Sequence, residues 1–196
     1  MILFFDVESS GLFREGLPVY DPTQPHLVEI GARLLDSKYQ TKGFIETMIQ
    51  PTGWSVEPEA LVVHGISEAD CARYGIDIRA ALSVFQQMCL KARFIVAHNL
   101  EFDRKVIAAQ LAKIGSDGLW WQRQAPKFKC TMEESKEVCR LPGQYGDFKF
   151  PSLAEAFCHF NPGVPFETTH RAGADIAACI SIYRALEGLH VENRTS

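Results

Sequence analysis

The sequence predicts an α/β fold in which helices cover a mixed sheet. Short apolar segments typical of strands dominate the first quarter of the chain, at Ile2–Val7, Leu27–Leu35 and Gly43–Gln50. Beyond them, segments with apolar residues at helical spacing alternate with two shorter apolar runs. Strands first, then helices interleaved with short strands, favour one mixed sheet with helices packed against it. A chain of 196 residues can bury one substantial core, so we expect a single domain.

The strands follow from local patterns. Ile2–Val7 is a short apolar run, which is typical of a buried strand. The second and third strands are expected to pair antiparallel, because the polar segment 36–38 between them suits a turn. Pro51 ends the third strand, since proline cannot donate a hydrogen bond to a sheet ladder. Phe94–Ala97 and Phe128–Cys130 are short enough to supply the fourth and fifth strands.

The helices follow from apolar periodicity and from start signals. The segments expected to be helical are Pro58–Val63, a turn from Ser67, Ile78–Lys91, Leu100–Ile114, Thr131–Arg140, Ser152–Cys158 and Ala172–Leu186. Capping-box spacing opens three of them, at Ser67–Asp70, Thr131–Glu134 and Ser152–Glu155. Residues 191–196 are expected to be a loose tail, which gives a domain over residues 1–188 and a C-terminal tail over 189–196.

Composition argues against several classes of protein. The N-terminal apolar run is short and has no basic segment, so it is not a secretory signal, and no stretch approaches the roughly 20 apolar residues of a membrane span. The six cysteines form no Cys-x-x-Cys pair, which argues against zinc and for the reducing cytoplasm. The net charge of −4 argues against a strongly basic coat for nucleic acid. A nuclease that uses metal ions remains compatible with this charge.

Three segments far apart in the chain carry acids in a pattern that suits divalent metal chemistry. Asp6 and Glu8 project from the same face of the first strand, because side chains alternate along a strand. Asp103 and Asp175 each lie near the start of a predicted helix, on its apolar face, which is unusual for an acid. Four gathered carboxylates would repel one another without cations, and Mg2+ prefers oxygen ligands. His170, just before Asp175, adds a candidate base.

This ordered set resembles the motifs of the DEDDh 3′-to-5′ exonucleases, the DnaQ-like branch of the ribonuclease H-like superfamily. Asp6 and Glu8 match the first motif, Asp-x-Glu, which Ser-Ser-Gly follows here where Thr-Thr-Gly is common. The segment from His98 to Asp103 matches the second motif, and His170 with Asp175 matches the third. The resemblance covers roughly residues 1 to 187. The loops Leu12–His26 and Gly143–Phe150 depart from the compact form of the family.

The resemblance implies a fold and a chemistry. The fold is a ribonuclease H-like mixed five-stranded sheet flanked by helices. The implied activity is metal-dependent 3′-to-5′ exonuclease cleavage of single-stranded DNA or RNA ends to nucleoside 5′-monophosphates. Two ions, Mg2+ or Mn2+, are implied, with Asp6, Glu8 and Asp175 at one ion and Asp6 and Asp103 at the other. His170 is implied as the acceptor of a proton from the attacking water.

Further residues are candidates for contact with the substrate. Ser9, Ser10 and Gly11 would let the backbone approach the terminal nucleotide, since glycine leaves room for it. His64 lies in a segment that resembles a family region near the 3′ end, although a hydrogen-bonded structural histidine is an equal alternative. Asn99 is a natural helix N-cap and a candidate positioning residue. Phe102 is suited either to stacking on a terminal base or to a core contact.

Two other function classes stay open at this stage. One is a proofreading or nucleic-acid-binding subunit of a replication or repair complex, for which a partner-binding tail is expected. The other is a nucleic-acid-binding module with weak catalysis, against which the intact set of acids and His170 argues. A homodimer and a polymerase partner remain open, as does the choice between DNA and RNA.

Overall fold

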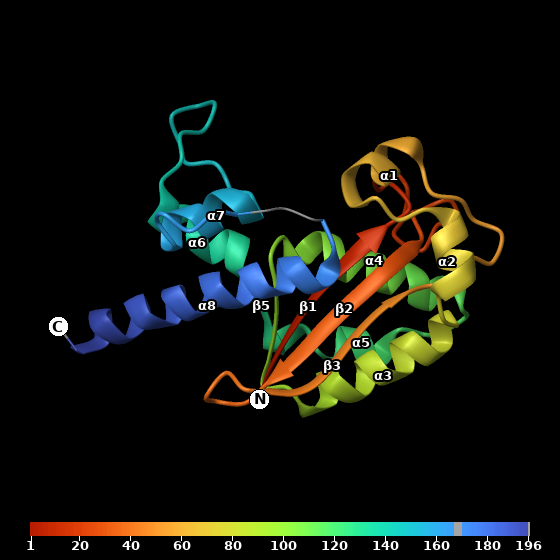
Figure 1. Ribbon diagram of the computed structural model, residues 1–196, viewed down its shortest axis with the longest axis horizontal. Helices are drawn as coiled ribbons and strands as arrows, with labels where there is room; N and C mark the ends of the chain where they lie inside the picture. The colour runs from red at the N-terminus through yellow and green to blue at the C-terminus, as the bar shows by residue number, and fades with distance from the viewer. Residues whose placement is uncertain (167–169, 196) are drawn as a thin grey trace.

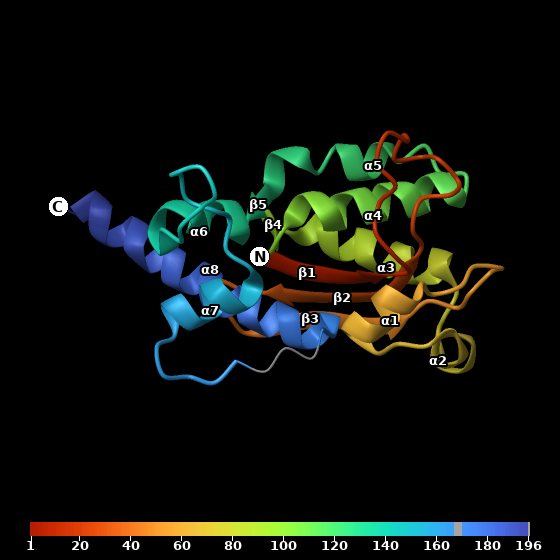
Figure 2. The same ribbon diagram turned by 90° about the horizontal axis from the view of Figure 1, so that it is seen from above.

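Residues 1–166 and 170–195 are described by the computed structural model, and they form one mixed sheet with helices on both of its faces (Figures 1 and 2). The sheet has five strands in the order β3-β2-β1-β4-β5. The strands are β1 (Ile2–Ser9), β2 (Leu27–Leu35), β3 (Thr41–Met48), β4 (Phe94–Ala97) and β5 (Phe128–Cys130). The predicted α/β architecture, the five strands and the antiparallel pairing of β2 with β3 are therefore confirmed.

The pairing of the strands determines which strand ends lie side by side at the edge of the sheet. β1 is central, antiparallel to β2 and parallel to β4, and β4 is parallel to β5. Parallel strands end at the same edge of a sheet, so the end of β1 lies beside the turn that follows β4. In the β1–β2 register, Asp6 is opposite Gly31 and Glu8 is opposite Glu29.

Helices enclose the sheet from two sides. They are α1 (Pro58–His64), α2 (Glu68–Tyr74), α3 (Ile78–Lys91), α4 (Leu100–Lys113), α5 (Leu119–Gln122), α6 (Thr131–Cys139), α7 (Leu153–Phe160) and α8 (Ala172–Thr195), with a 3-10 turn, η1, at Ala125–Lys127. Figure 2 shows α3, α4 and α5 over one face, with α7 and α8 over the other. No helix within the described ranges has both the length and the apolar character that crossing a membrane requires.

The two faces of β1 explain the apolar residues from Ile2 to Phe5. Phe5 points to the α3 and α4 side, where its ring lies 5.2 Å from that of Phe85 and 5.9 Å from that of Trp121. Phe4 points to the α8 side, where it meets Tyr183 edge to face at 5.3 Å. A strand buried on both faces needs apolar residues at every position, whereas a half-exposed strand alternates. Burial of these large aromatic side chains stabilises the core on both faces of the sheet.

Several element boundaries differ from the sequence-based expectation. α8 continues to Thr195 instead of ending at Leu186, so residues 191–195 are helical and not a loose tail. The end of α8 was predicted from its apolar stripe, which shows only where the helix packs against the sheet. Backbone hydrogen bonds can continue a helix past the last residue that packs in this way. Ser196 lies outside the described residues. α5 and η1 were not expected, because segments of three or four residues are too short to show periodicity.

The capping boxes at Ser67 and Ser152 are confirmed, whereas the one at Thr131 is wrong. Cys130 occupies the N-cap position of α6, because β5 passes directly into the helix and carries Thr131 into the interior. The buried Thr131 hydroxyl instead donates to the carbonyl oxygen of Ala97 at 3.3 Å. This hydrogen bond joins the start of α6 to the end of β4, so the hydroxyl does not cap the helix.

The predicted loop Leu12–His26 is held by one buried side chain. Gln24 is 2% exposed, and its amide nitrogen donates to the carbonyl oxygens of Arg14, Leu17 and Pro18, each at 3.2 Å. Its amide oxygen accepts from the backbone N–H of Arg14 at 2.9 Å. Buried polar groups of this kind replace the regular hydrogen bonds that a loop lacks. The loop is therefore an ordered extension of the fold.

We expect Gln24→Ala to loosen this loop without unfolding the sheet. The change removes the acceptor of the Arg14 N–H and the donor to the Leu17 carbonyl oxygen, and unsatisfied buried groups cost about 1–3 kcal/mol. Limited trypsin digestion should then cut faster after the exposed Arg14, while the thermal midpoint falls modestly. Gln87→Ala, at an exposed position of α3, is the matched control. Equal digestion rates for the two variants would show that Gln24 does not hold the loop.

Candidate active site

The end of β1 supplies the first two acids. Phe4, Asp6 and Glu8 alternate with the residues that point to the α3 and α4 side, so Asp6 and Glu8 lie on the α8 side of the sheet. α8 approaches this face closely because β2 has a glycine beneath it. A Cβ atom at Gly31 would lie 2.8 Å from the Cβ atom of Ala172. The small residues therefore allow the first turn of α8 to come down next to the two carboxylates.

The first turn of α8 supplies the third acid. Asp6, Glu8 and Asp175 each offer a carboxylate oxygen, and these three atoms lie within 4.8 Å of one another. The side chains come from two segments far apart in the sequence. Such a convergence of carboxylates is what a site for a hard divalent cation requires.

Asp103 approaches from the opposite side, on the first turn of α4. It is 3% exposed, and its Oδ1 accepts a hydrogen bond from the backbone N–H of Val7 at 3.2 Å. Asp103 thus faces β1 between Asp6 and Glu8, as the inward-facing position on the apolar stripe predicts. All four acids and His170 line one cleft of about 570 Å³.

The proximity of the acids changes their proton affinities. Desolvation, followed by the charge of Asp175, raises the pKa of Glu8 to about 8. Desolvation and the neighbouring carboxylates, Asp103 first among them, hold the pKa of Asp6 well above its usual range. Burial raises the pKa of Asp103, against the effect of the hydrogen bond from Val7, and burial also raises that of Asp175. Cations between the carboxylates would relieve this repulsion, so the donor set fits divalent metal ions.

His170 lies at the entrance of α8, beside the cleft. It is exposed, and its backbone φ of 42° is in the left-handed region, which is uncommon for a residue other than glycine. Residues 167–169, immediately before it, lie outside the described ranges. The ring is therefore available to solvent and to a ligand in the cleft, as a proton acceptor must be.

Of the serine-glycine segment after Glu8, Ser9 and Gly11 line the cleft, whereas the buried Ser10 does not. Ser9 Oγ donates to the carbonyl oxygen of Gly11 at 2.8 Å, and Ser10 Oγ accepts from the backbone N–H of His26 at 2.8 Å. A Cβ atom at Gly11 would lie 2.2 Å from a carboxylate oxygen of Glu57. Glu57 is exposed and its carboxylate can move aside, so this contact does not by itself require glycine, and the proposed role of Gly11 in close approach of the substrate stays a prediction.

His64, Asn99 and Phe102 line the same cleft but differ in their contacts. His64 is 4% exposed, with Nε2 donating to the carbonyl oxygen of Ser9 at 3.3 Å and Nδ1 accepting from Ile66 N–H at 3.0 Å. Both ring nitrogens are thus engaged, which favours the structural alternative. Asn99 occupies the N-cap position of α4, but its φ is 64° and its side chain makes no capping bond. Phe102 packs edge to face against Phe13 at 5.8 Å.

The sequence reasoning missed a buried acid and its partner. Glu29 on β2 is 0% exposed, and it forms an ion pair with Arg171, the residue between His170 and α8. The signal was present in the sequence, because Glu29 interrupts the apolar run of the second strand. A charge in a fully buried strand is rare unless it is paired.

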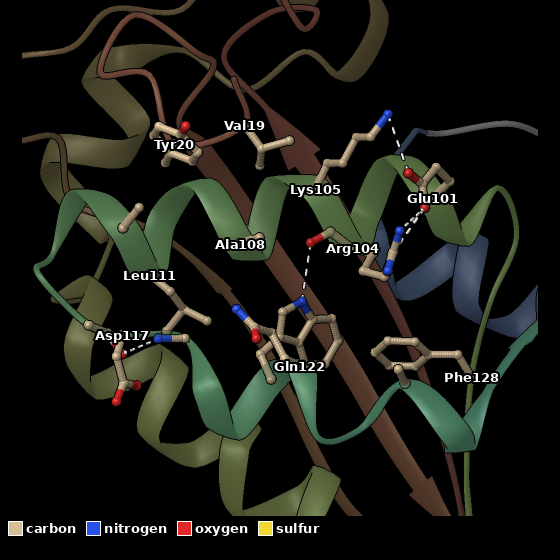
Figure 3. A pocket seen from close by; sticks show the side chains of 15 residues that line it. Val19, Tyr20, Glu101, Arg104, Lys105, Ala108, Leu111, Asp117, Gln122 and Phe128 are labelled. Atoms are coloured by element: carbon tan, nitrogen blue, oxygen red, sulfur yellow. Dashed lines mark hydrogen bonds and ion pairs between the residues drawn. The ribbon is translucent and has the colours of Figure 1, made fainter. Parts of the chain in front are cut away.

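A second cavity, of about 610 Å³, lies on the other side of α4 (Figure 3). It is bounded by Val19 and Tyr20 of the Leu12–His26 loop, by α4, and by the segment from α5 to β5. Trp121 forms part of its wall, and its ring N–H donates to the carbonyl oxygen of Arg104 at 3.2 Å. Glu101 already pairs with Arg104 and Lys105 at its rim. None of the gathered carboxylates lines it, so the acid-lined cleft is the candidate active site.

Comparisons with known proteins identify the family and the fold. The RNase_T family model, described as Exonuclease, matches residues 3–183, whereas no curated protein sequence matches the chain significantly. The chain is similar to E. coli exonuclease I in complex with a dA16 oligonucleotide, with a TM-score of 0.73, 18% identity and coverage of 95% of this chain and 40% of that chain. For the complex with dT13, the TM-score is 0.70 and the identity 19%, over 94% of this chain and 40% of that chain.

A zinc-bound form of the E. coli exonuclease I complex with single-stranded DNA is similar too, with a TM-score of 0.70 and 18% identity over 94% of this chain and 39% of that chain. This chain thus spans about two fifths of the length of the exonuclease I chains that it matches. At such identities the structural likeness shows the shared fold, while the family model covers nearly the whole chain. The chain therefore belongs to the exonuclease family, in the DEDDh (DnaQ-like) branch of the ribonuclease H-like superfamily.

Proposed function

We propose that this protein is a metal-dependent 3′-to-5′ exonuclease that shortens single-stranded nucleic acid and releases nucleoside 5′-monophosphates. The observation that carries the proposal is the convergence of Asp6, Glu8 and Asp175, whose carboxylate oxygens lie within 4.8 Å of one another beside His170. A cleft that gathers acids repels a phosphodiester unless cations are present. The arrangement therefore favours a reaction at phosphate that depends on metal ions over simple binding of nucleic acid.

The proposed ions are two Mg2+ or Mn2+. Asp6, Glu8 and Asp175 would hold one ion, and Asp6 with Asp103 would hold the other. When bound, such ions neutralise charge on the phosphate and promote ionisation of the attacking water. Asp103 would keep one oxygen on Val7 N–H, so its orientation is set by the backbone of β1.

The side chains around the acids have separate proposed roles. His170 would accept the proton of the attacking water, since its ring is exposed at the cleft. Asn99 has an exposed side chain without a capping bond, so it is free to contact the terminal nucleotide. Phe102 would support the terminal base while it packs on Phe13. His64 would act indirectly, because its contact with Ser9 holds the backbone from Ser9 to Gly11 in the cleft wall.

DNA is the proposed first substrate. The exonuclease I structures that share the fold hold dA16 and dT13 oligonucleotides, which supports a single-stranded DNA ligand for the corresponding cleft here. RNA of the same sequence is the direct comparison, because recognition of the 2′-hydroxyl separates the two polymers. We further propose that residues 1–188 act as one exonuclease domain, in the cytoplasm.

We expect digestion to begin at a free 3′ end. A 5′-labelled single-stranded oligonucleotide should give a ladder that descends one nucleotide at a time, and an inverted 3′ terminus should block it. Asp6→Asn protein prepared in the same way controls for contaminating nucleases. Cleavage of circular single-stranded DNA would indicate an endonuclease and contradict the proposal. Binding of the oligonucleotide without hydrolysis in Mn2+ would favour the binding-module alternative.

A further inference from the structure

Glu29 is an acid enclosed in the middle of the sheet, one strand away from the candidate metal site. It is 0% exposed and faces Glu8 across the β1–β2 pair. Removing a carboxylate from water is costly unless it gains strong partners. Its charge also raises the pKa values of Glu8 and Asp175, after burial. A further acid beside the four that line the candidate cation site therefore requires a structural explanation.

The partners of Glu29 all come from the segment that opens α8. Arg171 Nε donates to both carboxylate oxygens of Glu29 at 3.1 Å, and a terminal guanidinium nitrogen of Arg171 donates to Oε1. The backbone N–H of Ala172 donates to Oε2 at 3.0 Å. Glu29 thus binds a planar guanidinium through two nitrogens and accepts the first N–H of the helix. A carboxylate at a helix N-terminus is also favoured by the helix dipole.

These bonds join the rigid sheet to the residue next to His170. Arg171 directly follows His170, whose left-handed φ of 42° is a conformation that surrounding structure must hold in place. On the helix side, Ala172 packs against Gly31 of β2, so the first turn of α8 has little freedom to shift. The ion pair with Glu29 also holds Arg171, the residue that directly follows His170.

We infer that Glu29 is a positioning residue that acts through Arg171 to place His170 over the carboxylate cluster. The inference rests on the proposed function of His170 as the proton acceptor. Glu29 is not a metal ligand in this arrangement, because Arg171 and Ala172 engage both of its oxygens. The gathered oxygens belong to Asp6, Glu8 and Asp175 instead. Arg171 turns its charge toward Glu29 rather than serving as a free phosphate contact.

The first test is Glu29→Gln, which keeps the shape of the side chain and removes its charge. Loss of placement by about 1 Å costs on the order of 10²-fold in rate, so kcat on single-stranded DNA should fall by roughly 10- to 100-fold. KM should change by less than about threefold, because the ligating acids remain. Glu187→Gln is the matched control, since Glu187 lies on α8 and pairs with Lys129 at 3.7 Å, away from the cleft.

The second test asks whether Glu29 acts through Arg171. The double variant Glu29→Gln/Arg171→Gln should be no slower than the slower single variant, because both changes break one connection. Arg171→Lys should also lose kcat, since lysine keeps the charge but lacks the planar fork. If Glu29→Gln is unfolded at the assay temperature, Arg171→Lys is tested in its place. Its kcat should fall while its KM stays close to the wild-type value.

A third measurement does not depend on catalysis. The His170 ring proton signal in the NMR spectrum, assigned with His170→Ala, should shift in Glu29→Gln and Arg171→Lys but not in Glu187→Gln. If wild-type protein degrades no nucleic acid, the proposed function fails, while this shift still reports the positioning. Unchanged kcat and an unchanged His170 signal in Glu29→Gln would overturn the inference. A rise in KM alone on Arg171→Gln would do the same, because it would assign Arg171 to direct substrate contact.

Discussion

Removal of divalent cations should abolish hydrolysis completely, because the acid-lined cleft cannot accept a phosphodiester while its carboxylates are uncompensated. Activity on a single-stranded oligonucleotide should vanish in EDTA and return with Mg2+ or Mn2+. Asp6→Asn should lose both metal binding and turnover, and excess Mn2+ should not rescue it, since Asp6 is central to the proposed ligand set. Asp147→Asn, at an exposed position between α6 and α7, is the matched control. Full activity in EDTA would exclude the metal mechanism.

The stabilisation of the fold by a bound cation should depend on pH, and thermal melting can measure this dependence. The pKa of Glu8 in the folded protein is about 8, above the ordinary 4.5, so folding favours the protonated form. Glu8 therefore stabilises the metal-free fold at low pH, and this contribution is lost as the pH rises from about 4.5 through 8. A bound cation needs the carboxylate form, so its stabilising effect should grow over the same range. The increase in Tm on adding Mn2+ should thus be larger at pH 8 than at pH 6.

His170→Ala should lower kcat by about 10²- to 10⁴-fold, the usual contribution of a positioned base. Metal affinity should stay close to that of the wild type, since the four acids remain. His170 is exposed, so the change removes few packing contacts, and circular dichroism should show an intact fold.

His159→Ala is the matched control for this experiment. His159 is exposed on α7, where its ring packs on Phe160, and it does not line the cleft. Turnover near the wild-type value for His170→Ala at saturating Mn2+ would show that another group takes the proton. A parallel loss of metal affinity would instead indicate that His170 supports the ligands.

The structure modifies how two candidate substrate residues are understood. His64 was an open choice between substrate contact and a structural role, and its two engaged nitrogens favour the second. Burial also lowers the pKa of His64, which keeps the ring neutral while it donates to Ser9. Gly11 was attributed to close approach of the substrate, and the group nearest to a Cβ atom there is the carboxylate of the exposed Glu57, which can move aside. Both residues remain at the cleft, and the contacts of His64 give it a reason for its identity that lies within the protein.

The sequence alone determined the parts of this protein that local patterns encode. Apolar runs and helical spacing predicted the five strands and the long helices, because each pattern reflects which face of an element is buried. The inward positions of Asp103 and Asp175 were visible for the same reason, since an acid on an apolar stripe conflicts with its surroundings. The short α5 and the end of α8 were not predicted, because neither depends on a repeated apolar contact.

Only the tertiary structure decided which distant groups meet. The strand order β3-β2-β1-β4-β5 places α8 over β2 and turns Arg171 toward Glu29, a contact across 142 residues of sequence. The same packing carried Thr131 into the interior, away from the capping role that its local sequence suggested. Such pairings depend on the summed packing of the whole core and leave no periodic trace in the sequence. Local chemistry thus identified the acids, while the fold determined how His170 is held beside them.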